Sequence, residues 1–81
     1  MKKVALVIVN WNGLDDTLRC LQSIRSMQVN NVVLETIVVD NGSTDKSVSR
    51  IAEEFPEVKI LAFDTNLGFT GGNNAGIKYA M

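Results

Sequence analysis

Three largely apolar runs rich in β-branched residues constrain the fold more than any other feature of this sequence. They cover residues 4–9, 34–39 and 58–63. The first run is continuously apolar and lacks the alternation of a strand with one wet face, so it favours a strand covered on both faces. Strands of this kind belong to parallel sheets with helices packed on either side, and the runs therefore predict an α/β domain.

The segments between these runs have helical character. After the first run, apolar residues recur at helical spacing: Leu14, Leu18, Leu21 and Ile24. Residues 47–55 form a shorter amphipathic helix that Pro56 ends. We expect a loop over residues 64–72 and a helix over residues 73–81. The resulting order, β-α-β-α-β-α with parallel crossovers, predicts the first half of a Rossmann-like sheet.

Composition narrows the class of protein further. A chain of 81 residues suits one domain, spanning residues 1–81. The net charge of −1, without a run of Lys or Arg, gives no support for nucleic acid as a partner. With no histidine and the single Cys20, which we expect to be buried in the first helix, a zinc site is disfavoured. No stretch reaches the roughly 18 apolar residues that span a bilayer, so we expect a cytoplasmic chain.

An acidic residue follows the second run at the point where the strand ends. In dinucleotide-binding folds, a carboxylate in the place of Asp40 accepts hydrogen bonds from a ribose hydroxyl or a base N–H. The structural alternative is that Asp40 only holds the following loop through Asx-turn bonds. Position alone leaves both interpretations open. Asp45 is expected to cap the next helix rather than contact a ligand.

Asn10, Trp11 and Asn12 follow the first run in the same way. They lie next to the end of the second strand in the expected sheet, so a nucleobase could rest on this backbone or against Trp11. The alternative interpretation makes Trp11 a packing lid over the first helix. Asn12 or Gly13 would cap that helix.

A glycine-rich stretch over residues 68–76 follows the third run. Glycines allow the backbone to approach a ligand or a neighbouring strand closely, and a helix start offers free N–H groups to anions. The stretch is neither Gly-x-Gly-x-x-Gly nor a phosphate-binding P-loop. Its composition alone is therefore a weak signal.

Three segments together resemble the amino-terminal part of family 2 glycosyltransferases. They are residues 9–12, 38–45 and 66–76, in the order in which the family has them. The stretch Asn-Leu-Gly-Phe-Thr-Gly-Gly-Asn-Asn-Ala-Gly at 66–76 is most similar to the rhamnosyltransferase-like branch. The resemblance implies a GT-A fold, of which this chain would carry the first, nucleotide-sugar-binding half.

The same resemblance implies a nucleotide-diphosphate sugar donor and a set of site residues. It implies that Asp40, with Asn41 beside it, contacts the nucleoside base. One wall of the base pocket would be formed by Val9, Asn10, Trp11 and Asn12. The ribose or diphosphate would lie near Gly71, Gly72 and Asn73. Many members of the family carry Arg where Asn73 stands here, which alters the charge contact to the donor.

The chemistry that the resemblance implies is inverting sugar transfer. A carboxylate base deprotonates the acceptor hydroxyl, and a divalent Mg or Mn ion, held by an Asp-x-Asp-type motif, neutralises the leaving diphosphate. Nothing in this chain matches that motif, since Asp15 and Asp16 fall in a helix and Asp64 stands alone. We expect no catalytic residue here, no metal bound by this fragment alone, and a chain that is inactive by itself.

A second interpretation is a non-catalytic nucleotide-binding or assembly module. In a GT-A sheet the third, second and first strands run outward in that order, and a fourth strand pairs with the first. Without that partner, residues 4–9 form an unpaired apolar edge that recruits another strand, which predicts a homodimer. Membrane association of the complete enzyme is compatible with the resemblance. A receiver-like or flavodoxin-like signalling domain is disfavoured, because residues 9–12 lack the acids that a receiver needs.

Overall fold

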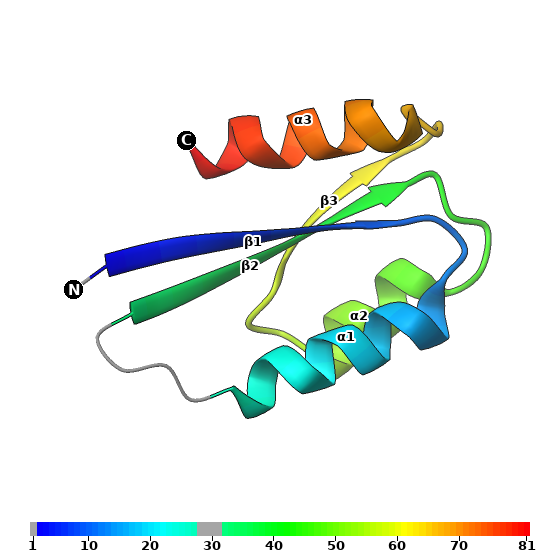
Figure 1. Cartoon of the computed structure of the whole chain (residues 1–81). Helices are drawn as coiled ribbons and strands as arrows, with labels where there is room; N and C mark the ends of the chain where they lie inside the picture. The colour runs from blue at the N-terminus through cyan, green and yellow to red at the C-terminus, as the bar shows by residue number, and fades with distance from the viewer. Residues whose placement is uncertain (1, 28–31) are drawn as a thin grey trace.

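The structure, a computed structural model, describes residues 2–27 and 32–81. Its elements are β1 (Lys2–Asn10), α1 (Leu14–Ser26), β2 (Val32–Asn41), α2 (Ser47–Glu54), β3 (Lys59–Phe63) and α3 (Gly68–Ala80). The three strands are parallel and lie in the order β1-β2-β3 (Figure 1). This arrangement confirms the predicted Rossmann-like β-α-β-α-β-α sheet and its outward strand order. Among the residues that the structure describes, no helix is long and apolar enough to cross a bilayer.

Helices cover both faces of the sheet. Figure 1 shows α1 and α2 side by side along one face and α3 along the other. The core against α1 and α2 consists of Leu21, Val38, Ile51 and Phe55. On β2, Ile37 and Val39 are fully buried as well. Because successive strand side chains point to opposite faces, these two face α3 while Val38 packs under α1 and α2.

Strand β1 is less covered than its apolar sequence indicates. Within the described residues it has one sheet neighbour, whereas β2 is paired on both sides. Val4 and Ala5 near its start are exposed, and burial increases toward Asn10 at its end. The expectation of a strand covered on both faces is therefore wrong for the first half of β1. An apolar run alone does not reveal how much of each face of a strand the neighbouring helices will cover.

Helix α3 begins at Gly68, inside the stretch expected to be a loop. The loop predicted over residues 64–72 therefore ends before Gly68, which has a φ of +77°. Glycine disfavours an isolated helix, which is why the sequence indicated a later start. In the structure, Gly72 and Gly76 are the buried residues of α3, and a side chain at Gly76 would clash with Val7. Close packing on the sheet thus outweighs the low helix propensity.

Cys20 is exposed, which corrects the expectation that it is buried. The buried residues of α1 are Thr17 and Leu21. A helix turns by about 100° per residue, so Cys20 lies on the solvent side although it precedes a core residue. The neighbouring apolar residues in the sequence therefore misled the prediction.

Candidate functional site

The candidate site centres on a contact between the ends of β1 and β2. Asn10 and Asp40 are paired in the sheet register, so both lie at its carboxyl edge. Asn10 is 1 % exposed and Asp40 is 3 % exposed. The Asn10 Nδ2 group donates to Asp40 Oδ1 at 2.9 Å and to Ser43 Oγ at 3.2 Å. The structure thus brings together two of the residues that the sequence selected.

Asp40 also organises the loop that follows β2. Its Oδ1 accepts a hydrogen bond from Ser43 Oγ at 2.7 Å, and its Oδ2 accepts one from the Ser43 backbone N–H at 3.0 Å. These are the Asx-turn bonds of the structural alternative. Contact between Asp40 and a nucleoside stays a prediction.

Thr17 joins the hydrogen-bonded cluster of Asn10, Asp40 and Ser43, although the sequence analysis did not select it. Its hydroxyl donates to Asn10 Oδ1 at 2.6 Å, and the residue is 6 % exposed. Thr17 lies in the first turn of α1, where its N–H donates to the Gly13 carbonyl. The sequence signal that could have identified it is a hydroxyl residue on the same helix face as Leu14 and Leu21.

Asn12 connects the loops after β1 and β2. Its backbone has a φ of +50°, and its N–H donates to Ser43 Oγ at 2.9 Å. Its side-chain Oδ1 accepts the N–H groups of Thr44 at 2.7 Å and Asp45 at 3.0 Å. Asn12 therefore ties two loops together instead of capping α1, whose N-cap is Gly13.

Trp11 stands beside this connection with 57 % of its surface exposed. That exposure disfavours the interpretation of Trp11 as a packing lid over α1. It leaves a large aromatic surface open at the carboxyl edge of the sheet, next to the Asn10–Asp40 pair. Base contact by Trp11 stays a prediction.

Asn41 anchors the start of α3. Its Nδ2 donates to the Gly68 carbonyl at 3.0 Å, and its Oδ1 accepts the Leu67 N–H at 3.2 Å. The side chain is 1 % exposed and points toward α3, away from the Asp40 carboxylate and its partners. This buried anchor explains how a helix can begin in a glycine-rich stretch.

The predicted diphosphate segment lies within α3, not in a loop. Gly72 is buried, and a Cβ there would lie 2.9 Å from Asn41 Nδ2 and 3.0 Å from Val9 Cγ1. Val9 therefore faces α3 as well. Gly71 and Asn73 flank this contact and are partly exposed. Of these residues, Gly71 and Asn73 are the ones that the structure leaves accessible.

A broad, open hollow of about 430 Å³ adjoins the site at the start of α1. Its lining comprises Asn12, Gly13, Leu14, Asp15, Asp16, Arg19 and Asp45. The Ser47 hydroxyl, and to a smaller extent the backbone N–H groups of Ser47 and Leu14, hold the pKa of Asp45 below its usual value. Asp45 also accepts the Ser47 N–H at 2.9 Å, and thus supports the start of α2 as predicted.

The described residues do not fit a divalent metal. Across residues 2–27 and 32–81, no three His, Cys, Asp or Glu side chains gather in a way that could hold an ion. Asp16 lies 3.5 Å from the Arg19 guanidinium, which competes with a metal for the carboxylate. We therefore derive no chemical step through a metal held by these residues.

The chain is similar in sequence to known glycosyltransferases. It is 33 % identical over 78 residues to the succinoglycan biosynthesis protein ExoO of Rhizobium meliloti, covering 95 % of this chain and 22 % of that protein. It is also 33 % identical over 81 residues to the uncharacterized glycosyltransferase YibD of Escherichia coli, with 96 % and 23 % coverage. The chain thus spans less than a quarter of the length of these relatives. Residues 5–81 match the model of Glycosyl transferase family 2, and the chain belongs to that family.

Proposed function

We propose that the carboxyl edge of β1 and β2 binds the nucleoside part of a nucleotide-diphosphate sugar. The complete protein would be a glycosyltransferase that moves the sugar to an acceptor hydroxyl. The observation that carries this proposal is the 2.9 Å hydrogen bond between Asn10 Nδ2 and Asp40 Oδ1, which joins site residues from neighbouring strands. Family membership supports the class of donor.

The Asp40 carboxylate retains one acceptor position for such a ligand. An ionised carboxylate offers about four acceptor positions. Asn10 Nδ2 and Ser43 Oγ use two on Oδ1, and the Ser43 N–H uses one on Oδ2. One position on Oδ2 is left. A single N–H donor, such as the imide of uracil or thymine, matches it, and we propose one of these bases as the ligand.

Trp11 supplies a second contact in this proposal. An aromatic side chain stacks on a base through its ring face, which is worth roughly 1–3 kcal/mol per base in nucleic-acid-binding proteins. Trp11 is exposed at the carboxyl edge, and the bonds of neighbouring Asn12 to Ser43 and Thr44 hold its loop in place. The base would therefore contact a loop whose position is held by these hydrogen bonds.

The finer features of the reaction are also proposals. Inverting transfer needs a base for the acceptor hydroxyl and a metal for the diphosphate, and we assign neither to the described residues. The stretch over residues 66–76 supports a rhamnosyltransferase-like donor site. The similarity to ExoO, a succinoglycan biosynthesis protein, supports a cell-surface polysaccharide as the product.

Calorimetric titration of the 81-residue chain with UDP and dTDP tests the proposal. We expect binding that does not depend on Mn²⁺, that is weaker for GDP, and that Asp40→Ala abolishes. Asp64→Ala is the matched control, because it removes an exposed carboxylate from the loop after β3. Asp40→Asn serves as a second variant, since it preserves the size of the side chain that organises the loop.

Circular dichroism establishes that each variant is folded before its affinity is compared. Absence of nucleotide binding by the folded wild-type chain contradicts the proposed function. Equal losses in Asp40→Ala and Asp64→Ala would show that the charge of the edge matters and the position of Asp40 does not.

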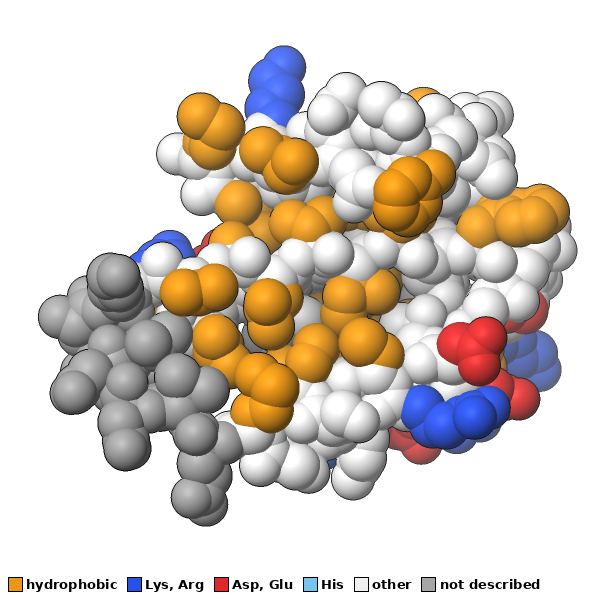
Figure 2. Space-filling view, in the orientation of Figure 1, with side chains coloured by type: hydrophobic (Ala, Val, Ile, Leu, Met, Phe, Trp, Pro, Cys, Tyr) orange, Lys and Arg blue, Asp and Glu red, His pale blue; other side chains and the backbone are white. Residues whose placement is uncertain are grey.

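A second candidate function is self-association through β1. The supporting observation is that β1 pairs with one strand in the described residues and exposes Val4. Figure 2 shows apolar side chains gathered on the side of the molecule where β1 runs, between α3 and α1. Light scattering of the wild-type chain and of Val4→Lys tests this candidate, because a charge at an edge strand opposes pairing. A wild-type monomer at micromolar concentration rules it out.

A further inference from the structure

We infer that Thr17 is a positioning residue of the proposed nucleoside site: its hydroxyl holds the Asn10 amide that orients the Asp40 carboxylate. The inference rests on the proposed function, since it assigns a role in a site for a nucleotide. It concerns a residue of α1 that lies outside the three segments on which the sequence analysis based the site, residues 9–12, 38–45 and 66–76. Thr17 acts through Asn10, and no hydrogen bond joins it to Asp40 directly.

The Asn10 amide has two chemically different ends, and both are used. Its Nδ2 donates to Asp40 Oδ1 at 2.9 Å and to Ser43 Oγ at 3.2 Å. Its Oδ1 accepts from the Thr17 hydroxyl at 2.6 Å. The carboxylate selects the end of the amide that faces it, because a carbonyl oxygen there would be repelled. The hydroxyl then holds the amide in that plane from the opposite side.

Burial makes the Thr17 hydroxyl hard to replace. Thr17, Asn10 and Asp40 are all buried, and each buried side-chain N or O in the described residues has a hydrogen-bond partner. If the hydroxyl is removed, Asn10 Oδ1 becomes a buried acceptor without a partner, a costly arrangement. The amide then relaxes toward another donor, and the bond from Nδ2 to Asp40 weakens.

Weakening of the bond from Asn10 to Asp40 also affects the acceptor position of Asp40 that the ligand would use. Asp40 Oδ1 is held by Asn10 and Ser43, and this leaves the free position on Oδ2. A carboxylate released from Asn10 keeps only its two bonds to Ser43, so the direction of the free position is less closely fixed. The first turn of α1 thereby contributes to nucleotide binding although Thr17 makes no contact with the ligand.

Titration of the 81-residue chain with UDP tests the inference through the substitution Thr17→Val, which preserves the shape and removes the hydroxyl. We expect about a tenfold loss of affinity, equivalent to about 1.4 kcal/mol. Thr17→Ser restores the hydroxyl and is expected to bind UDP like the wild type. Thr65→Val is the matched control, because it removes an exposed hydroxyl from the loop after β3.

The side-chain amide signals of Asn10 in a ¹H–¹⁵N spectrum give a readout that needs no ligand. We expect two separate, exchange-protected signals in the wild type and Thr17→Ser, and loss of protection in Thr17→Val. A merely structural role would lower stability in Thr17→Val without changing these signals in the folded protein. If Thr17→Val does not fold, Thr17→Cys, which retains a weak donor, is expected to show intermediate affinity.

Three results overturn the inference, and they can be told apart. If Thr17→Val binds UDP like the wild type while Asp40→Ala does not bind, the positioning role is wrong and the proposed function stands. If the folded wild-type chain does not bind UDP, the proposed function fails and the inference fails with it. Wild-type affinity in Thr17→Cys, where Thr17→Val is unfolded, also contradicts the role of the hydroxyl.

Discussion

The two ends of α1 are both tied to the rest of the domain by polar side chains, but in opposite ways. At its start, Thr17 donates to Asn10, and all the partners are buried. At its end, Arg25 reaches the segment after α2 through an ion pair that is roughly half exposed. The buried end lies at the proposed site and the exposed end lies away from it.

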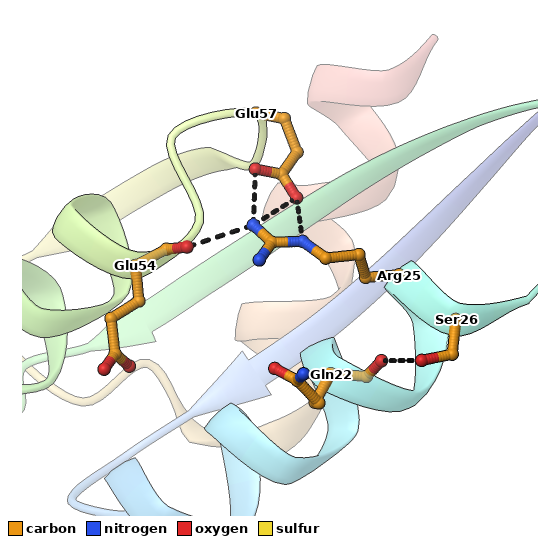
Figure 3. Close-up of polar contacts among 5 residues, drawn as sticks. All are labelled: Gln22, Arg25, Ser26, Glu54 and Glu57. Carbon is orange, nitrogen blue, oxygen red and sulfur yellow. Dashed lines mark hydrogen bonds and ion pairs between the residues drawn. The ribbon is translucent and has the colours of Figure 1, made fainter.

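Figure 3 shows the exposed end in detail. The Arg25 guanidinium donates to both carboxylate oxygens of Glu57, at 2.8 and 2.9 Å, and to the Glu54 carbonyl at 3.0 Å. It also lies 4.2 Å from the centre of the Phe55 ring. Exposed charges of this kind are screened by solvent and tolerate changes of geometry.

The comparison shows where geometry has to be exact. The buried cluster depends on matching each donor with an acceptor, because water cannot replace a missing partner. The exposed ion pair between Arg25 and Glu57 depends on the attraction between two charges, which water and salt weaken. Substitutions that remove one atom should therefore be far more damaging at the start of α1 than at its end.

The largest effect is expected from Asn10→Leu. The substitution removes both ends of the amide, leaving Thr17 without its acceptor and Asp40 with one donor fewer. Buried polar groups left without partners cost about 1–3 kcal/mol each, so we expect the free energy of unfolding to fall by about 3 kcal/mol. Urea denaturation measures it. The control is Asn74→Leu at an exposed position of α3, and equal losses in the two variants would contradict the comparison.

An intermediate effect is expected from Asn12→Gly. Glycine accepts the φ of +50° at this position, so the change isolates the bonds from the Asn12 side chain to Thr44 and Asp45. We expect a loss of about 1 kcal/mol in the free energy of unfolding. Asn12→Ala adds backbone strain and should be less stable than Asn12→Gly. Wild-type stability in Asn12→Gly would show that the side-chain bonds contribute nothing, and equal stability of the two variants would show that the φ of +50° carries no strain.

A smaller effect is expected from Arg25→Ala. Loss of the guanidinium removes the ion pair and the contact with Phe55, and the part due to charge should disappear in 1 M salt. Thermal unfolding of wild type and variant in low and high salt measures both parts. A difference that is the same in both salts would assign the whole contribution to packing on Phe55.

The smallest effect concerns the pKa of Glu57 and the pH dependence of stability that follows from it. Its own backbone N–H, followed by Arg25, holds the pKa of Glu57 below the usual value of 4.5. A carboxyl group with a lowered pKa stabilises the fold above its unfolded pKa, and this contribution is lost as the pH falls through the folded pKa. In Arg25→Ala, an NMR titration should find a pKa that is higher than in the wild type but still lowered. A pKa unchanged by Arg25→Ala would show that the pair is weak in solution.

The fold was predictable because it depends on features that are local in the sequence. The apolar runs fixed three strands, and the helical spacing of Leu14, Leu18 and Leu21 fixed α1 between the first two. The start of α3 was missed because helix propensity is also local, whereas the Asn41 side chain that anchors Gly68 comes from another element. The exposure of Cys20 was missed because apolar neighbours in sequence lie on different sides of a helix.

The candidate site was predictable at the level of position and less so at the level of contacts. The rule that site residues follow the strands of a parallel sheet selected Asn10, Asp40 and Asn12 correctly as neighbours. The rule does not consider the two faces of a strand, and the alternation of side chains along β2 turns Asn41 toward α3, away from Asp40. Thr17 was missed because its role depends on a hydrogen bond across two elements.

The glycine contacts of α3 have a consequence for the width of the candidate site. Gly72 and Gly76 set the height at which the helix axis lies above the sheet, since Val9 and Val7 leave no room for a side chain. A methyl group at Gly76 would act as a wedge under the helix. The rise of an α-helix places that wedge about 12 Å from Gly68, the end that Asn41 holds. The helix would thus tilt about its held end, so a residue remote from the carboxyl edge would shift Gly71 and Asn73 relative to the strands.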